Sequence, residues 1–156
     1  MTETHMSTIV GNEENFTNLI RNLILLEHDA IAAYDSTIER LEDAGAASKI
    51  AEFRQDHLQH LDVLHEIALQ LGLEPPTEGD MKQMLTTGKI MLAKLAGDGA
   101  ILKAMKTNED DTVTAYDRAK DHPDAKPETS AFFDKALSDE LRHRDWMETM
   151  AERSGS

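Results

Sequence analysis

The 156-residue sequence predicts an all-α domain, an antiparallel four-helix bundle made of two helical hairpins joined by a long crossover. Three observations support this prediction. Apolar residues recur every three to four positions along four long segments, as on the buried face of an amphipathic helix. The 4 prolines and 8 glycines fall mainly near the ends of those segments. A rare arrangement of polar residues also occurs twice, once in each half of the chain.

In the first half, residues 1–11 form a polar tail and the helical pattern begins at residue 12. The first apolar stripe runs over Phe16–Leu41, and Gly45 is expected to end this helix. The second stripe runs over Ile50–Leu71 and stops at Gly72, which a Pro-Pro pair follows. Two neighbouring helices with a short turn between them predict an antiparallel hairpin.

The second half begins with a long connection, residues 73–99, in which we expect a short extra helix near Met81–Leu95. Asp98 is the predicted N-cap of the third long helix. Pro127 suits the first turn of the fourth helix, which is expected to fray near Ser154. The bundle domain therefore spans residues 12–153.

The bulk composition excludes several classes of function. The formal net charge is -14, so binding to nucleic acid or to an anionic membrane surface is not expected. The absence of cysteine excludes disulfides and thiolate metal sites. No apolar run reaches membrane length, and the first residues do not resemble a signal peptide. We therefore expect a cytoplasmic protein.

The repeated arrangement has two parts. The first is a glutamate with a tyrosine seven residues later, and it recurs after 82 residues; those tyrosines are the 2 tyrosines of the chain. The second is an aspartate followed by two potential metal ligands at positions i and i+3, and it recurs after 83 residues. The first copy consists of Glu27…Tyr34 and Asp56-His57-x-x-His60. The second copy consists of Glu109…Tyr116 and Asp139-Glu140-x-x-His143.

Six of these ionisable residues fall on stripes that are otherwise apolar. They are Glu27, His57, His60, Glu109, Glu140 and His143. Burying an unpaired charge costs several kcal/mol, whereas a whole domain is stable by roughly 5–15 kcal/mol. No lysine or arginine occupies the inner positions, so we interpret the six residues as ligands of metal ions. Carboxylate and imidazole ligands without sulfur suit iron, manganese or zinc.

The remaining members of the repeat are expected to support the ligands. Ligand histidines commonly donate their second ring nitrogen to a carboxylate, a role that suits Asp56 and Asp139. Tyr34 and Tyr116 lie two turns from the glutamates, within reach of carboxylates of the opposite hairpin.

Ionisable residues away from the stripes have a simpler interpretation. A lone acid or histidine on an amphipathic helix is usually solvated or at the edge of the core. We apply this to residues such as Asp29, Glu52, Asp111 and His122, which are expected near the surface.

The pattern resembles the ferritin-like, rubrerythrin-like superfamily of di-metal carboxylate bundles. These use one Glu from each of two helices and Glu-x-x-His from each of the other two. The residues that match are Glu27, Glu109, His60, and Glu140 with His143. The resemblance covers about residues 12–153 and is closest to small uncharacterised bacterial ferritin-like proteins.

The resemblance implies two divalent metal ions, iron first, with zinc or manganese as alternatives. It also implies a ferroxidase- or peroxidase-type reaction with oxygen or peroxide, in iron handling or in the response to oxidative stress. The chain departs from the family where a bridging Glu is expected, because His57 stands there. We also expect no fifth helix of the kind found in cage-forming ferritins, and the sequence has none of the cysteines of a rubrerythrin-type electron-transfer module.

Two alternatives stay open. The first is a structural ion such as zinc that clamps the helices of a protein acting through protein–protein contacts. The second is a metal-free interaction bundle with a relic site, paired through the Met81–Leu95 helix. A homodimer is expected on general grounds, since two-fold dimers are the commonest oligomers.

Overall fold

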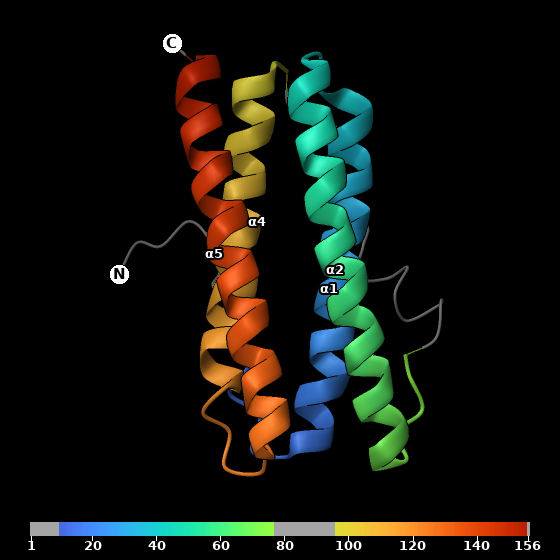
Figure 1. Ribbon diagram of the computed structural model, residues 1–156. Coiled ribbons are helices and arrows are strands. Elements are labelled where there is room, and N and C mark those ends of the chain that lie inside the picture. The colour runs from blue at the N-terminus through green and yellow to red at the C-terminus, as the bar shows by residue number, and fades with distance from the viewer. Residues whose placement is uncertain (1–9, 77–95, 156) are drawn as a thin grey trace.

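The computed structural model describes residues 10–76 and 96–155. The described chain folds into four long helices, which confirms the all-α four-helix prediction. They are α1 (Phe16–Arg40), α2 (Ala44–Leu71), α4 (Asp98–Ala119) and α5 (Pro127–Gly155). α1 pairs with α2, α4 pairs with α5, and the two hairpins meet mainly through α1 and α4 (Figure 1). The extra helix predicted near Met81–Leu95 lies outside the described residues.

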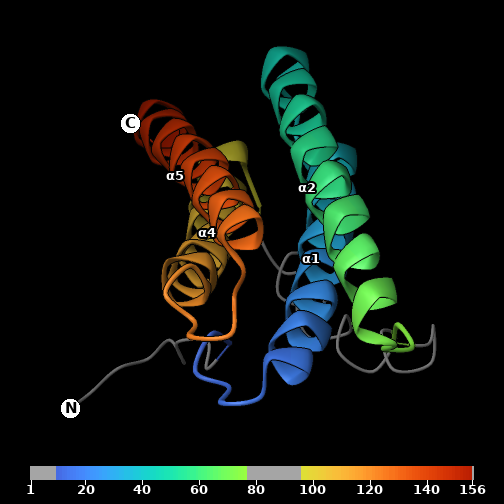
Figure 2. The ribbon, with the colours of Figure 1, turned by 60° about the horizontal axis from the view of Figure 1, so that its bottom comes forward.

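The helices of each hairpin run in opposite directions, and so do α1 and α4 (Figure 1). α2 therefore ends at the opposite end of the bundle from the start of α4. Figure 2 shows the two hairpins as separate units, with α4 and α5 on one side and α1 and α2 on the other. This arrangement lets one inward-facing stripe from each helix meet along the centre of the bundle.

The turn between α1 and α2 corrects one predicted boundary. Gly45 does not end the first helix but lies in the first turn of α2. The chain leaves α1 at Leu41, whose backbone is extended and whose side chain is buried. Asp43 then caps α2 by accepting a hydrogen bond from the backbone N–H of Ala46. The position of this turn is therefore determined by the burial of Leu41 and by the Asp43 cap, and not by the glycine.

The start of α4 corrects a second boundary. The N-cap is Gly97, with φ of 89°, and Asp98 is already helical. The Asp98 carboxylate instead accepts hydrogen bonds from the backbone N–H groups of Glu42 and Asp43, at 2.9 and 3.0 Å. Asp98 therefore joins the second hairpin to the turn of the first. The predicted helix end at Gly72 is confirmed, because this residue is the left-handed C-cap of α2.

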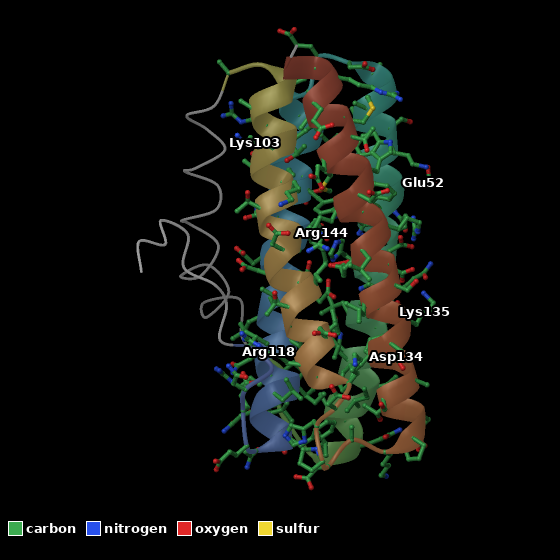
Figure 3. All side chains as sticks on the ribbon, turned by 90° about the vertical axis from the view of Figure 1, so that its left-hand side faces the viewer. Glu52, Lys103, Arg118, Asp134, Lys135 and Arg144 are labelled. Carbon is green, nitrogen blue, oxygen red and sulfur yellow. The ribbon has the colours of Figure 1, made fainter. Side chains whose placement is uncertain are left out.

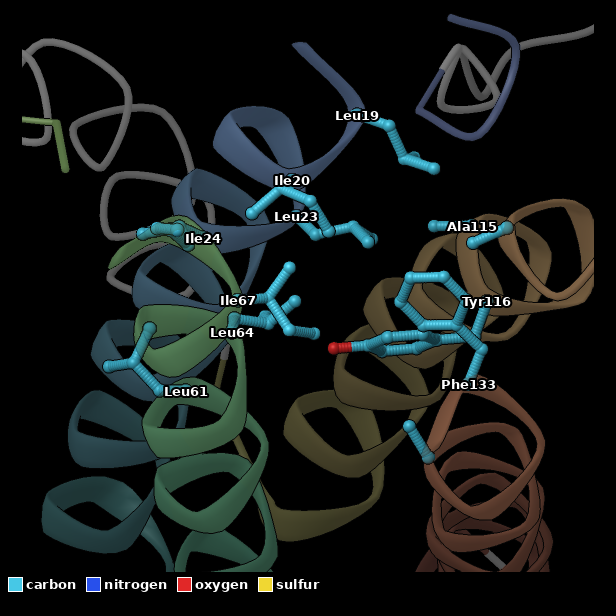
Figure 4. Packing of buried hydrophobic residues seen from close by; sticks show 13 residues of the cluster. Leu19, Ile20, Leu23, Ile24, Leu61, Leu64, Ile67, Ala115, Tyr116 and Phe133 are labelled. Atoms are coloured by element: carbon cyan, nitrogen blue, oxygen red, sulfur yellow. The ribbon is translucent and has the colours of Figure 1, made fainter. Parts of the chain in front are cut away.

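Two apolar clusters fill the bundle, one toward each end. Figure 4 shows the cluster that includes Leu23, Leu64, Tyr116 and Phe133. The other includes Phe53, Leu102, Met105, Tyr34 and Met147. Along each helix, the predicted polar residues fall between the members of one cluster and those of the other.

Charged side chains cover the outside of the bundle, as Figure 3 shows for Glu52, Lys103 and Lys135. Of the helices described, none has an apolar stretch long enough to span a bilayer.

Candidate metal centre

The structure brings the six predicted ligand residues into one buried cluster, called here the inner cluster. Each is at most 1% exposed. All four helices contribute: Glu27 from α1, His57 and His60 from α2, Glu109 from α4, and Glu140 and His143 from α5. Its donor atoms form two groups that share His57. We call them the Glu140 half (His57, Glu109, Glu140 and His143) and the Glu27 half (Glu27, His57 and His60).

The Glu140 half joins three helices. His57 Nε2 lies 3.3 Å from Glu109 Oε1 and 3.4 Å from Glu140 Oε1. His143 Nδ1 lies 3.2 Å from the same Glu140 oxygen and 3.7 Å from Glu109 Oε2. These four side chains thus direct nitrogen and oxygen atoms at one another across a short distance.

The contacts in the Glu27 half are shorter than those in the Glu140 half. Glu27 Oε1 lies 2.6 Å from His57 Nδ1, and Glu27 Oε2 lies 3.1 Å from His60 Nδ1. The Tyr116 hydroxyl also donates to Glu27 Oε2. Glu27 therefore has three hydrogen-bond partners within the protein.

The two tyrosines reach across from one hairpin to the other. Tyr34 on α1 donates its hydroxyl proton to Glu109 Oε1 on α4, at 2.5 Å. Tyr116 on α4 makes the corresponding contact to Glu27 on α1, and its hydroxyl points across the bundle in Figure 4. Burial, and then the neighbouring glutamates, raise the pKa of both hydroxyls. Both therefore stay protonated and act as donors.

The two aspartates also cross between the hairpins. His143 Nε2 lies 2.8 Å from Asp56 Oδ2, and His60 Nε2 lies 2.8 Å from Asp139 Oδ2. Each contact holds one ring nitrogen of a histidine and turns the other toward the inner cluster, as in many metal sites. Arg142, at the surface, hydrogen-bonds to both aspartates.

Without an added cation, protons on the imidazoles supply the positive charge. Burial raises the pKa of Glu27, but His57 and His60 outweigh it and bring that pKa to about 2. Burial disfavours the imidazolium form of His60, yet its hydrogen bonds to Asp139 and Glu27 raise its pKa to about 9. Metal ions and protons therefore compete for the same nitrogen atoms.

Glu140 behaves differently from the other carboxylates of the cluster. Burial and then the charge of Glu109 raise its pKa to about 7. Within the described part of the chain, both of its oxygens are buried without a hydrogen-bond partner. The 3.2 Å contact with His143 is close but lacks the alignment of a hydrogen bond. Buried carboxylate oxygens without partners are costly, and a cation is the partner that suits them. The residues present therefore fit a divalent metal ion.

The structure also adds residues that the sequence reasoning missed. Thr112 donates a hydrogen bond to Glu109 Oε2 at 3.1 Å. A threonine one helical turn after Glu109 was the available signal. Asp29 and Asp111, expected on the surface, line a crevice of about 20 Å³ between α1 and α4, which Glu109 also lines. Burial and then Asp111 raise the pKa of Asp29 to about 6.

His122 was also expected near the surface, and that expectation is wrong. It is 8% exposed, and its Nε2 donates to the backbone carbonyl of Glu13 at 2.9 Å. Its Nδ1 accepts from the backbone N–H of Asp124 at 3.0 Å, and its ring packs against Phe16. Both nitrogens are thus satisfied, and this histidine is structural.

Residues 15–122 match the family model described as Domain of unknown function (DUF2383). The chain belongs to this family. The matched range covers α1, α2 and α4, including Glu27, His57, His60 and Glu109, whereas α5 lies beyond it. No curated protein matches the chain.

Proposed function

We propose that the inner cluster binds divalent metal ions, at most two, with iron the leading candidate. The observation that carries this proposal is the Glu140 carboxylate, which is fully buried and has no hydrogen-bond partner in the described structure. The other donors support it: three carboxylates and three imidazoles lie together, with no sulfur ligand.

Bound iron would supply reaction with oxygen or peroxide, in iron handling or in the response to oxidative stress. The residues around it hold the ligands and exclude water. Tyr34 and Tyr116 hold Glu109 and Glu27, and Asp56 and Asp139 hold His143 and His60. Tyr34 also lies 3.3 Å from His143 Nδ1, which places a hydroxyl beside the ligands.

The test is anaerobic loading with Fe(II), followed by elemental analysis and then by addition of oxygen or hydrogen peroxide. We expect bound iron and consumption of the oxidant that follows the iron content. The matched variant is His122→Gln, which alters a buried histidine outside the cluster and should keep both properties. A loaded wild-type protein that consumes neither oxidant contradicts the redox function.

A second candidate is a structural ion, zinc first, in a protein that acts through protein–protein contacts. It is favoured by the position of the cluster, because the Glu140 half joins α2 of one hairpin to α4 and α5 of the other. Here EDTA should lower the melting temperature of the zinc-loaded protein by many degrees. An unchanged melting curve after removal of the zinc would contradict it.

A further inference from the structure

We infer that the inner cluster fills in two unequal steps. The first ion is held by the Glu140 half, while the Glu27 half stays a hydrogen-bonded unit until a second, much weaker ion replaces those bonds. This inference rests on the proposed function, because it requires that the cluster binds a divalent ion.

The first argument is the difference between two buried glutamates. Glu27 accepts hydrogen bonds from Tyr116, His57 and His60, so it is neutralised by its own surroundings. Glu140 is as deeply buried, yet both of its oxygens have no hydrogen-bond partner among the described residues. In the Glu140 half an ion gains a carboxylate that has no hydrogen bond, and it displaces two long contacts of 3.3 Å, from His57 Nε2 to Glu109 and from His143 Nδ1 to Tyr34. In the Glu27 half it must break the shorter hydrogen bonds of Glu27 with His57 and His60, at 2.6 and 3.1 Å.

The second argument is the spacing of the donor atoms. Ligand atoms about 2.1 Å from one ion lie about 3.0 to 3.4 Å from each other in octahedral or tetrahedral geometry. In the Glu140 half, His57 Nε2 and His143 Nδ1 lie 3.4 and 3.2 Å from Glu140 Oε1. In the Glu27 half, Glu27 Oε1 and His57 Nδ1 are 2.6 Å apart. That distance is too short for two ligands of one ion and is normal for a charge-assisted hydrogen bond.

The third argument is the sharing of His57. Its Nε2 faces the Glu140 half and its Nδ1 faces Glu27. A neutral imidazole has one N–H group and one lone pair. When Nδ1–H donates to Glu27, the lone pair is on Nε2 and serves the Glu140 half. The neutral His57 ring can therefore offer a lone pair to an ion in only one half at a time. Binding an ion through Nδ1 would require its proton to leave that nitrogen and its hydrogen bond to Glu27 to break.

The repeat explains why the halves differ. His57 stands at the position that corresponds to Glu140 in the other copy of the motif. A glutamate at that position would give the Glu27 half a second carboxylate, so that each half would have two. With His57, the Glu27 half has one carboxylate, and that carboxylate is already hydrogen-bonded three times.

The experiment is an anaerobic titration of the metal-free full-length protein with Co(II), followed by calorimetry and by visible absorption. We expect one tight equivalent and a second that binds at least about 100-fold more weakly. Glu140→Gln should lower the affinity for the first ion by about 100-fold or more. The matched variant Glu27→Gln removes an outer partner of His57 and should lower it only about tenfold.

A second measurement does not depend on the folding of any variant. Crystals of the wild-type protein with one equivalent of Co(II) should show anomalous scattering beside Glu140 and His143. Two equally tight equivalents, an anomalous peak beside His60, or equal losses in both variants would overturn the stepwise order and leave metal binding intact. A wild-type protein that binds no cobalt, iron or zinc would overturn the proposed function itself.

Discussion

The contact between Tyr34 and Glu109 gives a sharp quantitative prediction for the substitution Tyr34→Phe. The hydroxyl is buried and donates to a carboxylate oxygen at 2.5 Å. A hydrogen bond to a charged group contributes about 1.5–3 kcal/mol. Glu109 keeps its hydrogen bonds with Thr112 and His57, and the hydroxyl's other contact, to His143 Nδ1, is long at 3.3 Å, so the main loss is one hydrogen bond. We expect the free energy of unfolding of the metal-free protein to fall by about 2 kcal/mol.

The assay is thermal unfolding of the metal-free protein, followed by circular dichroism. For a chain of this size, a loss of about 2 kcal/mol lowers the melting temperature by roughly 4–8 °C. Tyr116→Phe is the matched variant, and it should cost a similar amount, about 2 kcal/mol, because Glu27 keeps His57 and His60 as partners just as Glu109 keeps His57 and Thr112. A double-mutant cycle between Tyr34→Phe and Glu109→Gln should show coupling of at least about 1 kcal/mol. If Tyr34→Phe is as stable as wild type and the cycle shows no coupling, the cross-hairpin contact is refuted.

Three further predictions concern charge. The pKa values of His60 and His143 are raised to about 9 in the fold, so the metal-free protein should lose stability as the pH rises from about 6.5 to 9. Melting temperatures measured across that range check this. The melting temperature of a metal-loaded sample should change much less. His57→Glu gives the Glu27 half a second carboxylate, as the Glu140 half already has, and cobalt titration should then show two equivalents within about tenfold of each other in affinity. Because folding raises the pKa of Asp29 from 3.8 to about 6, its charge costs stability progressively between about pH 4 and 6 and fully above that range. Asp29→Asn should therefore stabilise the protein by about 1 kcal/mol at pH 8, after allowance for solvent screening, and have no effect at pH 3. Urea unfolding at both pH values checks this.

The sequence predicted the fold from its periodicity and the inner cluster from its repeat. A polar residue in the register of an apolar stripe must face the interior, whichever residues end the helix. This is why residues as distant as Glu27 and His143 were expected in one cluster, and in the structure their two groups of donor atoms share His57. Helix ends depend on weaker and more local interactions, such as capping hydrogen bonds and the burial of single side chains. At Gly45 and Asp98, nearby caps and a buried leucine decided the boundary.

Other features depend on where side chains point after packing. Periodicity gives the face of a helix on which Glu140 lies, but not that its oxygens receive no hydrogen bond. Nor does it show that Arg142, on the outer surface, contacts both Asp56 and Asp139. His122 lies off the predicted stripes and is buried by the chain before α1, through its contact with the Glu13 carbonyl. Such contacts are set by the tertiary arrangement.

The exchange of partners between the hairpins has a consequence for how the bundle holds together. Each hairpin carries an acid whose tyrosine donor is on the other hairpin, and each carries a histidine whose aspartate is on the other. One hairpin alone would lose these tyrosine and aspartate partners, and Glu27 and Glu109 would keep only the partners on their own hairpins. The two hairpins therefore depend on each other for the partners of their buried ionisable groups, and we expect them to unfold as one cooperative unit.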